Sequence, residues 1–444
     1  MPYTNADEAA ALQRQGWYAV LVLGIAYIFS YMDRQLLTLL IEPIKTHLHI
    51  SDTQVSLISG LAFALCYSLF ALPLGRLADT VSRRNVIAFG VCAWSVMTGA
   101  CGLAQSFIQL FIARMGVGIG EAALIPSAYS MIADYFPPRR LALAMGLFVL
   151  GAPLGAGLAL IAGGSVVDLV GRFPPIRVGH EFLRPWQAAF LIIGGAGLLV
   201  ALTALTVKEP ERKSLPRSVI SESNDGFSVA EVFQFLRRRA GFLALLIGGL
   251  ALINIFNYGV LAWMATLFIR IHGWSLPQTG IAIGFELLTF GCLGPVAGGL
   301  LVNEFMRRGH HDACLRGILF SVVLLLPSSV VMALASSATT AIIFVAPVIF
   351  GIFLMAGIFP TLIQIITPNR MRGQVSAVYL FIVNMAGLGL GPTAYAFATD
   401  YIFKSDRLLN YSLASVSVLL LTAGGALIAC AIKPYSRAVA EARG

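Results

Sequence analysis

Residues Arg114-Met115-Gly116-Val117-Gly118-Ile119-Gly120-Glu121 place an arginine and a glutamate inside a long apolar run, 107–135. Seven helical residues make two turns, so the two charges share one face and lie about 10 Å apart along the axis. Ionisable groups at the centre of a bilayer-length helix are expensive, which indicates that this chain uses them. The three glycines permit a neighbouring helix to approach closely. We expect that neighbour to carry Asp33 and Arg34.

The composition excludes an ordinary soluble fold. Of the 444 residues, 58% are hydrophobic and only 11% are charged, and the mean hydropathy is +0.84. In soluble domains about a quarter of the residues are charged. A hydrocarbon core about 30 Å thick needs roughly 20 apolar residues per helix. The sequence therefore predicts an all-α membrane protein with twelve transmembrane helices, at 17–41, 53–78, 85–104, 107–132, 140–166, 186–207, 240–270, 277–303, 313–336, 340–366, 373–398 and 407–432.

The basic residues predict the orientation of these helices. Most of the 30 lysine and arginine residues lie in loops that face the cytoplasm if both termini do, which is the positive-inside pattern. The first apolar run has full spanning length after a polar start, so no cleaved signal peptide is expected. We expect a monomeric multi-pass protein in the lipid bilayer of the cell membrane, bacterial inner or plasma, with both termini cytoplasmic. Basic residues scattered over short loops argue against nucleic acid as a partner.

The sequence offers no pattern for catalysis, a cofactor or a metal. The six cysteines contain no CxxC pair and lie within or at the ends of predicted helices, where they are expected to act as small apolar residues. The six histidines lie in or beside loops, and none lies in mid-helix. We therefore expect no catalytic residues, no metal and no cofactor, and not an enzyme.

A polar stretch divides the chain into two halves. It runs over 208–239, follows the sixth predicted helix, and ends in a short basic amphipathic segment, 229–239. The sequence thus predicts an N-terminal six-helix bundle at 1–207, a central cytoplasmic linker at 208–239, and a C-terminal six-helix bundle at 240–444.

The two halves also repeat a short pattern. Gly75 and the pair Arg83-Arg84 match Gly299 and the pair Arg307-Arg308 at one common spacing, although Asn303 replaces the acid of the first copy. Weak internal symmetry of this kind is typical of a duplicated transporter.

Three motifs carry a resemblance to a known family. The stretch Gly75-Arg76-Leu77-Ala78-Asp79-Thr80-Val81-Ser82-Arg83-Arg84 resembles the loop motif of the major facilitator superfamily. Arg114 with Gly118 and Gly120 is similar to the fourth-helix motif of that superfamily, and Gly151-Ala152-Pro153-Leu154-Gly155 is similar to its fifth-helix motif. The resemblance implies the major facilitator fold, with two pseudo-symmetric six-helix bundles and transport by alternating access.

A narrower resemblance concerns the first helix. Tyr31-Met32-Asp33-Arg34, together with Arg114 and Glu121, resembles the Spinster family of lysolipid and sphingolipid transporters. It implies a secondary active, proton-coupled transporter of an amphiphilic anion such as a lysolipid or sphingoid phosphate. A proton-coupled transporter of small organic anions needs much the same residues, so that alternative stays open.

The candidate proton-coupling residues are Asp33, Arg34, Arg114 and Glu121. Burial disfavours the charged form of a carboxyl group, so a proton on Glu121 or Asp33 changes which arginine pairing is favoured. We expect Arg114 to be the cation that the two carboxylates share. The alternative is a static cluster of buried ion pairs that fixes the register of the helices.

The candidate cytoplasmic gate lies in the loop motif. We expect Asp79 to cap the cytoplasmic N-terminus of the eleventh predicted helix, where the helix dipole favours an anion, and Arg83 to pair with Asp134. The resemblance implies that these contacts hold the cytoplasmic side closed. Gly75 and Arg84 belong to the same motif, and for Arg84 a role in topology alone is an open alternative.

Polar residues within the predicted helices are candidates for lining a substrate cavity, because such faces turn away from lipid. In the second half, Asn254, Asn257 and Tyr258 share one helix face, and Glu286 is the residue that we most expect to serve function. Simple interhelical hydrogen bonds are the alternative for each of them. The full candidate set is Tyr27, Tyr31, Ser127, Asn254, Asn257, Tyr258, Glu286, Gln364 and Asn384.

Overall fold

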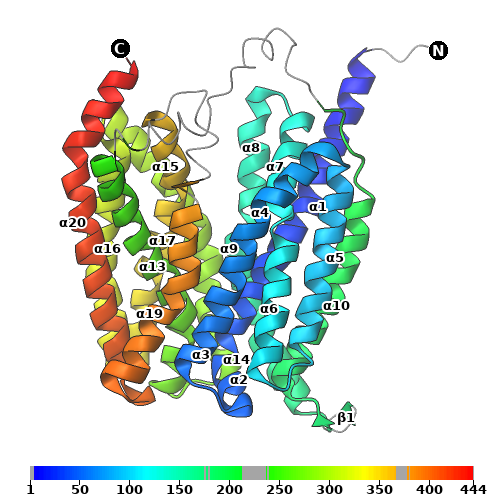
Figure 1. The fold of residues 1–444 in the computed structure, drawn as a ribbon, viewed down its shortest axis with the longest axis vertical. Helices are drawn as coiled ribbons and strands as arrows, with labels where there is room; N and C mark the ends of the chain where they lie inside the picture. Colours follow the sequence, from blue (N-terminus) through cyan, green and yellow to red (C-terminus); the bar gives the residue numbers. More distant parts are fainter. Residues whose placement is uncertain are drawn as a thin grey trace. The chain divides into compact units, whose positions relative to one another are not determined.

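The computed structural model describes residues 5–174, 177–178, 181–212, 237, 240–366, 378–379 and 381–443. These residues are mostly helical (Figure 1). Eleven of the helices formed by them are long and apolar enough to cross a membrane. The third predicted span forms one more helix, α5 (Arg83–Cys101), which has 19 residues and a polar first turn. The expectation of twelve membrane helices is therefore confirmed.

The contacts divide the chain into two compact units. The first comprises Met1–Lys213 with Ser275–Phe285, and the second comprises Ser214–Trp274 with Glu286–Gly444. The helices of the first unit are α1 (Asn5–Leu39), α2 (Ile41–Leu48), α3 (Asp52–Ser56), the π-helical η1 (Leu57–Leu61), α4 (Ala62–Thr80), α5, α6 (Phe107–Glu121), α7 (Leu124–Tyr135), α8 (Pro138–Val149), α9 (Gly151–Gly171) and α10 (Pro185–Leu205).

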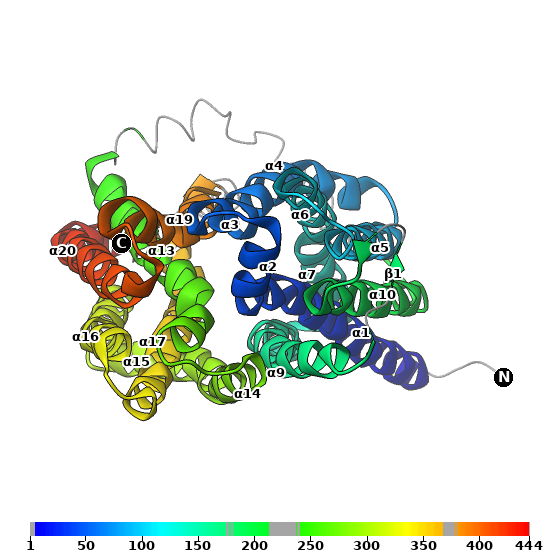
Figure 2. The same ribbon diagram turned by 90° about the horizontal axis from the view of Figure 1, so that it is seen from below.

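Within the first unit, α1 packs against α9 and α10, α5 lies between α6 and α10, and α4 packs against α6. Figure 2 shows these helices end-on. A short antiparallel hairpin, β1 (Arg177–Val178) with β2 (Glu181–Phe182), stands between α9 and α10.

One segment groups differently from its place in the sequence. Residues 275–285, most of α14 (Leu276–Glu286), belong to the first unit by their contacts, although the sequence predicts them in the C-terminal bundle. Small residues explain this packing. Gly280 lies against the backbone carbonyl of Leu160 in α9, and Gly284 lies against that of Gly157, so a Cβ atom at either glycine would collide with the backbone of α9.

The fourth membrane helix is broken, because Ala122 and Ala123 form a turn between α6 and α7. Its glycines meet different neighbours from the one expected. Gly118 packs against the backbone of α4 at Phe63, and Gly120 packs against the backbone of α5. The close approach predicted from the glycines therefore occurs, but with α4 and α5 rather than with α1.

The second unit contains the remaining helices. Here α13 packs against α20 and α19, and α17 packs against both α15 and α16. Only residues 208–212 and 237 of the predicted linker are described, so the basic amphipathic segment lies outside the described residues except at that last position. The elements are α13 (Ala240–Arg270), the π-helical η2 (Leu287–Gly291), α15 (Cys292–Arg307), α16 (Ala313–Leu334), α17 (Ala338–Ile366), the π-helical η3 (Met385–Leu390), α19 (Gly391–Phe397), the π-helical η4 (Ala398–Phe403), the 3₁₀ turn η5 (Asp406–Leu408) and α20 (Leu409–Arg443).

The π-helical segments repeat between the two halves. The second membrane helix contains η1, and the eighth, its counterpart in the predicted duplication, contains η2. Such segments are rare and frequently accompany functional sites. Two candidate cavity residues stand directly before one, Glu286 before η2 and Asn384 before η3.

Candidate functional site

Two arginine–carboxylate pairs lie inside the first unit. In the first pair, the Nη1 atom of Arg114 lies 2.6 Å from the Oδ2 atom of Asp33, and both side chains are 1% exposed. The Thr98 hydroxyl on α5 donates to the other oxygen of Asp33 at 2.7 Å. Both oxygens of this carboxylate therefore have partners.

The second pair joins Arg34 on α1 to Glu121 at the end of α6. The Glu121 Oε2 atom accepts hydrogen bonds from Arg34 Nε at 2.7 Å and from the Ser30 hydroxyl at 2.6 Å, and it lies 2.5 Å from Arg34 Nη2. The Oε1 atom is buried and has no hydrogen-bond partner among the described residues. This carboxylate thus uses one oxygen for three contacts and leaves the other unsatisfied.

The pairing differs from the prediction that Arg114 is shared. Each carboxylate has its own arginine, Asp33 with Arg114 and Glu121 with Arg34. Helix geometry explains the difference, because consecutive residues such as Asp33 and Arg34 point about 100° apart around the axis. They therefore face different partners, and the second cation comes from α1 itself.

Aromatic rings surround the two guanidinium groups. The Phe63 ring centre on α4 lies 4.4 Å from Arg34 Cζ and 5.5 Å from Arg114 Cζ, so one ring contacts both cations. Tyr31 and Tyr67 contact Arg34 at 5.1 and 5.0 Å. The sequence analysis did not identify Phe63 and Tyr67. Their spacing of four residues indicates that both rings lie on one face of the membrane helix that follows the helix of Arg34.

The two arginines differ in access. The side chain of Arg34 is 14% exposed, whereas that of Arg114 is 1% exposed. A cation in a desolvated aromatic setting interacts more strongly with the rings than one in water. Because Arg34 is the more exposed of the two arginines, it is the one that a ligand can reach.

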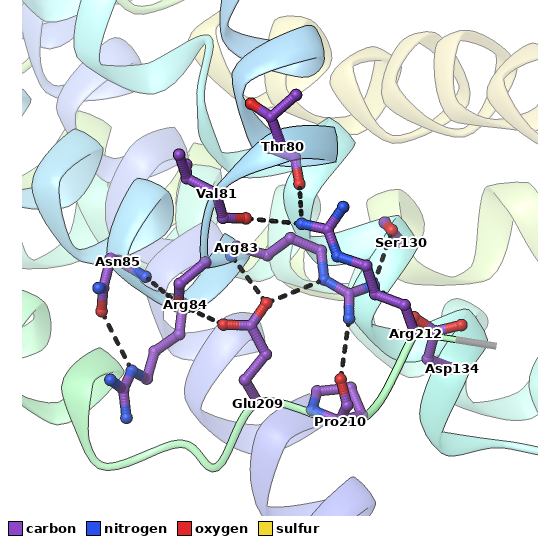
Figure 3. A network of polar contacts seen from close by, with 12 residues as sticks. Thr80, Val81, Arg83, Arg84, Asn85, Ser130, Asp134, Glu209, Pro210 and Arg212 are labelled. Atoms are coloured by element: carbon purple, nitrogen blue, oxygen red, sulfur yellow. Dashed lines mark hydrogen bonds and ion pairs between the residues drawn. The ribbon is translucent and has the colours of Figure 1, made fainter. Parts of the chain in front are cut away.

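A second polar network joins the start of α5 to the chain after α10 (Figure 3). The Arg83 side chain is 2% exposed and pairs with Asp134 at the end of α7, as the sequence predicts. It also donates to the Ser130 hydroxyl at 2.9 Å and to the Pro210 carbonyl at 3.1 Å. Its Nε lies 3.3 Å from the Oε1 atom of Glu209.

Glu209 is a member of this network that the sequence reasoning missed. Its carboxylate accepts from the Arg83 backbone N–H at 2.9 Å and from the Ser82 hydroxyl. Burial by itself raises the pKa of Glu209, but the hydrogen bonds from Ser82 and Arg83 and the Arg83 charge outweigh it, so the pKa lies below its usual value. Arg212 further ties this segment to α4, donating to the carbonyls of Ala78 and Val81 at 2.9 and 2.6 Å.

The other residues of the loop motif stand apart from Arg83. Arg84 is directed away from the network and donates through Nε to Asn85 at 3.2 Å (Figure 3). Gly75 lies near Pro126 of α7. Asp79 is exposed on α4, and the helix end that it is predicted to cap falls within 367–377, outside the described residues.

In the first unit, two of the candidate cavity residues, Tyr27 and Tyr31, belong to an aromatic cluster. The Tyr27 ring stacks on Phe148 at 4.8 Å and contacts Tyr31 edge-on at 5.1 Å. Tyr129 contacts Phe148 at 5.6 Å. Ser127 is fully buried, and its hydroxyl has no hydrogen-bond partner among the described residues.

In the second unit, the candidate cavity residues differ in how far they are satisfied. Asn254 donates to the Val383 carbonyl at 2.8 Å, which is an interhelical hydrogen bond. By contrast, Asn257 Oδ1 and Glu286 Oε2 are buried without a hydrogen-bond partner among the described residues. Tyr258 and Asn384 are half-buried, and the side chain of Gln364 lies outside the described residues.

Comparisons with known proteins are consistent along most of the chain. The family model described as Major Facilitator Superfamily matches residues 23–392. An MFS-type efflux pump of Mycolicibacterium smegmatis is 28% identical over 417 residues, covering 92% of this chain and 90% of the relative. A hexuronate transporter of Bacillus subtilis is 26% identical over 392 residues, covering 86% of this chain and 87% of the relative.

The fold comparison agrees with the sequence resemblance. The solved structure of a bacterial homolog to the human lysosomal transporter Spinster, in an inward-facing and unoccupied conformation, superimposes with a TM-score of 0.79. It is 28% identical in sequence, and the match covers 96% of this chain and 98% of that one. The predicted similarity to Spinster is therefore confirmed.

Proposed function

The chain belongs to the major facilitator superfamily, and we propose that it is a proton-coupled secondary transporter that moves an amphiphilic anion by alternating access. The observation that carries this proposal is the pair of Arg34 and Glu121. Arg34 is a partly exposed cation among three aromatic rings, and it pairs with a buried carboxylate, Glu121, that has one oxygen unsatisfied among the described residues.

The coupling step follows from this geometry. While Glu121 is charged, it neutralises Arg34 through Oε2. A proton on Oε1, the oxygen without a partner among the described residues, removes that negative charge and leaves Arg34 able to bind an anionic head group. Proton and substrate thus act on the same arginine, and each changes the balance between the two open states. Asp33 and Arg114 fix the position of α1 beside this site.

The surroundings of Arg34 favour an amphiphilic substrate. Tyr31 and Tyr67 are half-buried and offer apolar faces next to the cation. The buried Phe63 ring packs on Arg34 and Tyr67, and the buried Tyr27–Phe148 stack packs on Tyr31. A ligand with one anionic head and an apolar body matches both features. Together with the similarity to Spinster, this supports a lysolipid or sphingoid phosphate as the substrate.

A second candidate substrate is a small organic anion. A hexuronate transporter is among the relatives that match most of the chain. A carboxylate can pair with Arg34 as a phosphate does, and aromatic faces can pack on a sugar ring. The difference between the candidates therefore lies in the length of the apolar body, which an assay can vary directly.

The orientation and the gate belong to the same proposal. We place the protein in the cell membrane with both termini on the cytoplasmic side, so that the Arg83 network also lies on the cytoplasmic side. Arg83, Asp134 and Asp79 then keep the cytoplasmic side closed while the transporter is open to the outside. In the second half, the unsatisfied Asn257 and Glu286 supply polar groups for the transport path.

Transport by reconstituted protein tests the proposal. Full-length protein in proteoliposomes should accumulate a lysophospholipid against its gradient only when a pH gradient is imposed. A hexuronate in the same assay decides between the two substrate classes. In Glu121→Gln, gradient-driven accumulation should fall about tenfold or more, while exchange at equal pH persists, because the neutral amide mimics the protonated carboxyl.

A matched variant controls for the loss of a carboxylate in itself. Glu304→Gln changes a half-exposed glutamate at the end of α15 that pairs with Arg307 and Arg308, and it should keep wild-type accumulation. Full pH-driven accumulation by Glu121→Gln would show that the carboxylate is structural and that the proposed coupling is wrong.

A further inference from the structure

A groove opens on the surface of the first unit where α4, α5 and α6 meet. Its volume is about 280 Å³, many times the volume of roughly 10–15 Å³ that a single water molecule needs. Its rims are large apolar side chains that are themselves exposed, Leu77 at 44% and Phe89 at 75%. Asn85 is the polar side chain among the described residues that line it.

Small residues explain why the surface is hollow here. Gly90 of α5 and Gly120 of α6 bring the two backbones into contact, because a Cβ atom on either would collide with the other helix. These glycines, with Ala93 and Ala123, line the groove between the larger side chains of its rims. The close crossing of α5 and α6 therefore leaves a groove between the larger side chains on the surface.

The depth of the groove matches one membrane leaflet. Arg83 begins α5 at the polar end, and Ala93 lies ten residues further, or about 15 Å along the helix. The hydrocarbon core is about 30 Å thick, so the groove runs from the head-group level to about mid-bilayer. An apolar groove of this depth on the outer surface of a membrane protein is suited to one acyl chain of a lipid.

A cation, Arg84, lies at the polar end of the groove. Arg84 is half-buried and donates through Nε to Asn85, which lines the groove. Its two terminal nitrogens have no hydrogen-bond partner among the described residues, whereas Arg83 is occupied by Asp134 and Glu209. The N-terminus of α5, a 19-residue helix, adds a partial positive charge at the same level.

From these features we infer that the groove binds an anionic phospholipid, with an acyl chain along α5 and the phosphate on Arg84. In the orientation proposed above, this lipid comes from the inner leaflet. The site differs from the candidate transport site, because its lining residues include neither Arg34 and Glu121 nor the rings that contact Arg34. It nevertheless touches Gly120 near the end of α6 and Ala123 in the turn that follows Glu121, so its occupant packs against the broken part of the fourth membrane helix.

Lipid binding to the purified full-length protein tests the inference. Native mass spectrometry can compare phosphatidylglycerol with phosphatidylcholine of the same acyl chains, and the wild type should prefer phosphatidylglycerol. Ala93→Phe places a ring in the groove and should weaken binding of both lipids about tenfold, as expected when two methylene groups lose their apolar site. Val96→Phe adds the same ring at an exposed position of α5 outside the groove and should bind as the wild type does.

The head-group part of the inference has its own variant. Arg84→Gln should reduce the preference for phosphatidylglycerol over phosphatidylcholine roughly fivefold, the effect of one arginine near an anionic surface. Arg140→Gln, an exposed arginine in the first turn of α8, is the matched control and should keep the preference. Unchanged binding in Ala93→Phe, or an unchanged preference in Arg84→Gln, would overturn the assignment. Because Arg84 is at the surface, its variant remains informative even if Ala93→Phe does not fold.

Discussion

Two neighbouring residues of α1 form two ion pairs of the same chemistry in different surroundings. Asp33 and Arg114 are both 1% exposed, and Thr98 satisfies the second carboxylate oxygen. The other pair, Arg34 with Glu121, has a cation that is 14% exposed and a carboxylate oxygen without a partner among the described residues. In the first pair both carboxylate oxygens have partners and both side chains are shielded from water, although the Nε atom of Arg114 has no hydrogen-bond partner among the described residues. The second has room for a proton on one member and an anion on the other.

The difference teaches that an ion pair in a membrane helix is not evidence of function by its presence alone. Desolvation of two buried charges largely cancels their attraction, so a complete pair adds little stability, but removal of one partner leaves an uncompensated charge. A sealed pair is thus a structural constraint. A pair whose carboxylate keeps one unsatisfied oxygen and whose cation is partly exposed is suited to switching.

The largest predicted effect comes from breaking the sealed pair. Asp33→Ala leaves Arg114 charged and buried, which should lower the free energy of unfolding by about 3–5 kcal/mol. Thermal unfolding of the purified protein in detergent measures this loss. The double variant Asp33→Leu with Arg114→Leu should recover much of it, because no unpaired charge remains.

An exposed pair provides the control for this prediction. Asp168 and Arg172 form an ion pair one helical turn apart, with side chains 45% and 73% exposed. Asp168→Ala should therefore cost no more than about 0.5 kcal/mol. If Asp33→Ala were no more destabilising than Asp168→Ala, the description of Asp33 and Arg114 as a sealed structural pair would be incorrect.

A smaller effect should separate the two pairs through the ring that contacts both. Phe63 lies closer to Arg34 than to Arg114, at 4.4 against 5.5 Å. Phe63→Leu keeps an apolar side chain but removes the buried ring that holds the Arg34 guanidinium, so it should weaken binding of an anionic substrate by up to about thirtyfold, the full worth of a desolvated cation–π contact. Titration calorimetry with a lysophospholipid measures this change.

The control removes a ring elsewhere in the same unit. Phe107 contacts Phe111 at the start of α6, whereas the rings that contact Arg34 and Arg114 in the described part of the chain are Tyr31, Phe63 and Tyr67. Phe107→Leu should bind substrate as the wild type does. Equal affinity in Phe63→Leu and the wild type would mean that the aromatic surroundings of Arg34 do not shape the site.

Sequence patterns were sufficient to predict what depends on hydropathy. Each of the twelve predicted spans is occupied by helix in the described residues, because the thickness of the bilayer sets the length of each apolar run. The Arg83–Asp134 contact was also predictable, since it follows from a recognised motif. The burial of Asp33, Arg114 and Glu121 agrees with the cost of exposing charge to lipid.

The partners of the charges could not be predicted in the same way. The depth of a residue along a helix does not fix the direction in which its side chain points around the axis. The sequence therefore predicted Arg114 as a partner of Glu121, whereas Glu121 pairs with Arg34 in the structure. The role of Phe63 depends on how closely α4 approaches α6, which Gly118 permits but does not specify. Glu209 stands in a polar stretch that hydropathy identifies as a linker, and only its folded position shows that it binds Arg83.

The smallest predicted effect concerns that last residue, which lies outside the membrane where water weakens ion pairs. Hydrogen bonds from Ser82 and Arg83 hold the pKa of Glu209 below its ordinary value of 4.5 despite partial burial. A carboxyl group with a lowered pKa stabilises the fold above that ordinary value, and the contribution disappears as the pH falls through the lowered pKa. Glu209→Gln should therefore lose up to about 1 kcal/mol at neutral pH.

The pH dependence distinguishes this contribution from a simple loss of packing. The difference in free energy of unfolding between Glu209→Gln and the wild type should stay constant from neutral pH down to about 5 and narrow below 4.5, the ordinary pKa of the group. Thermal unfolding over that pH range measures it. Glu211→Gln, two residues further along the chain at an exposed position, should match the wild type throughout. A deficit in Glu209→Gln that did not narrow in acid would assign its effect to packing and leave the Arg83 network without an electrostatic contribution from Glu209.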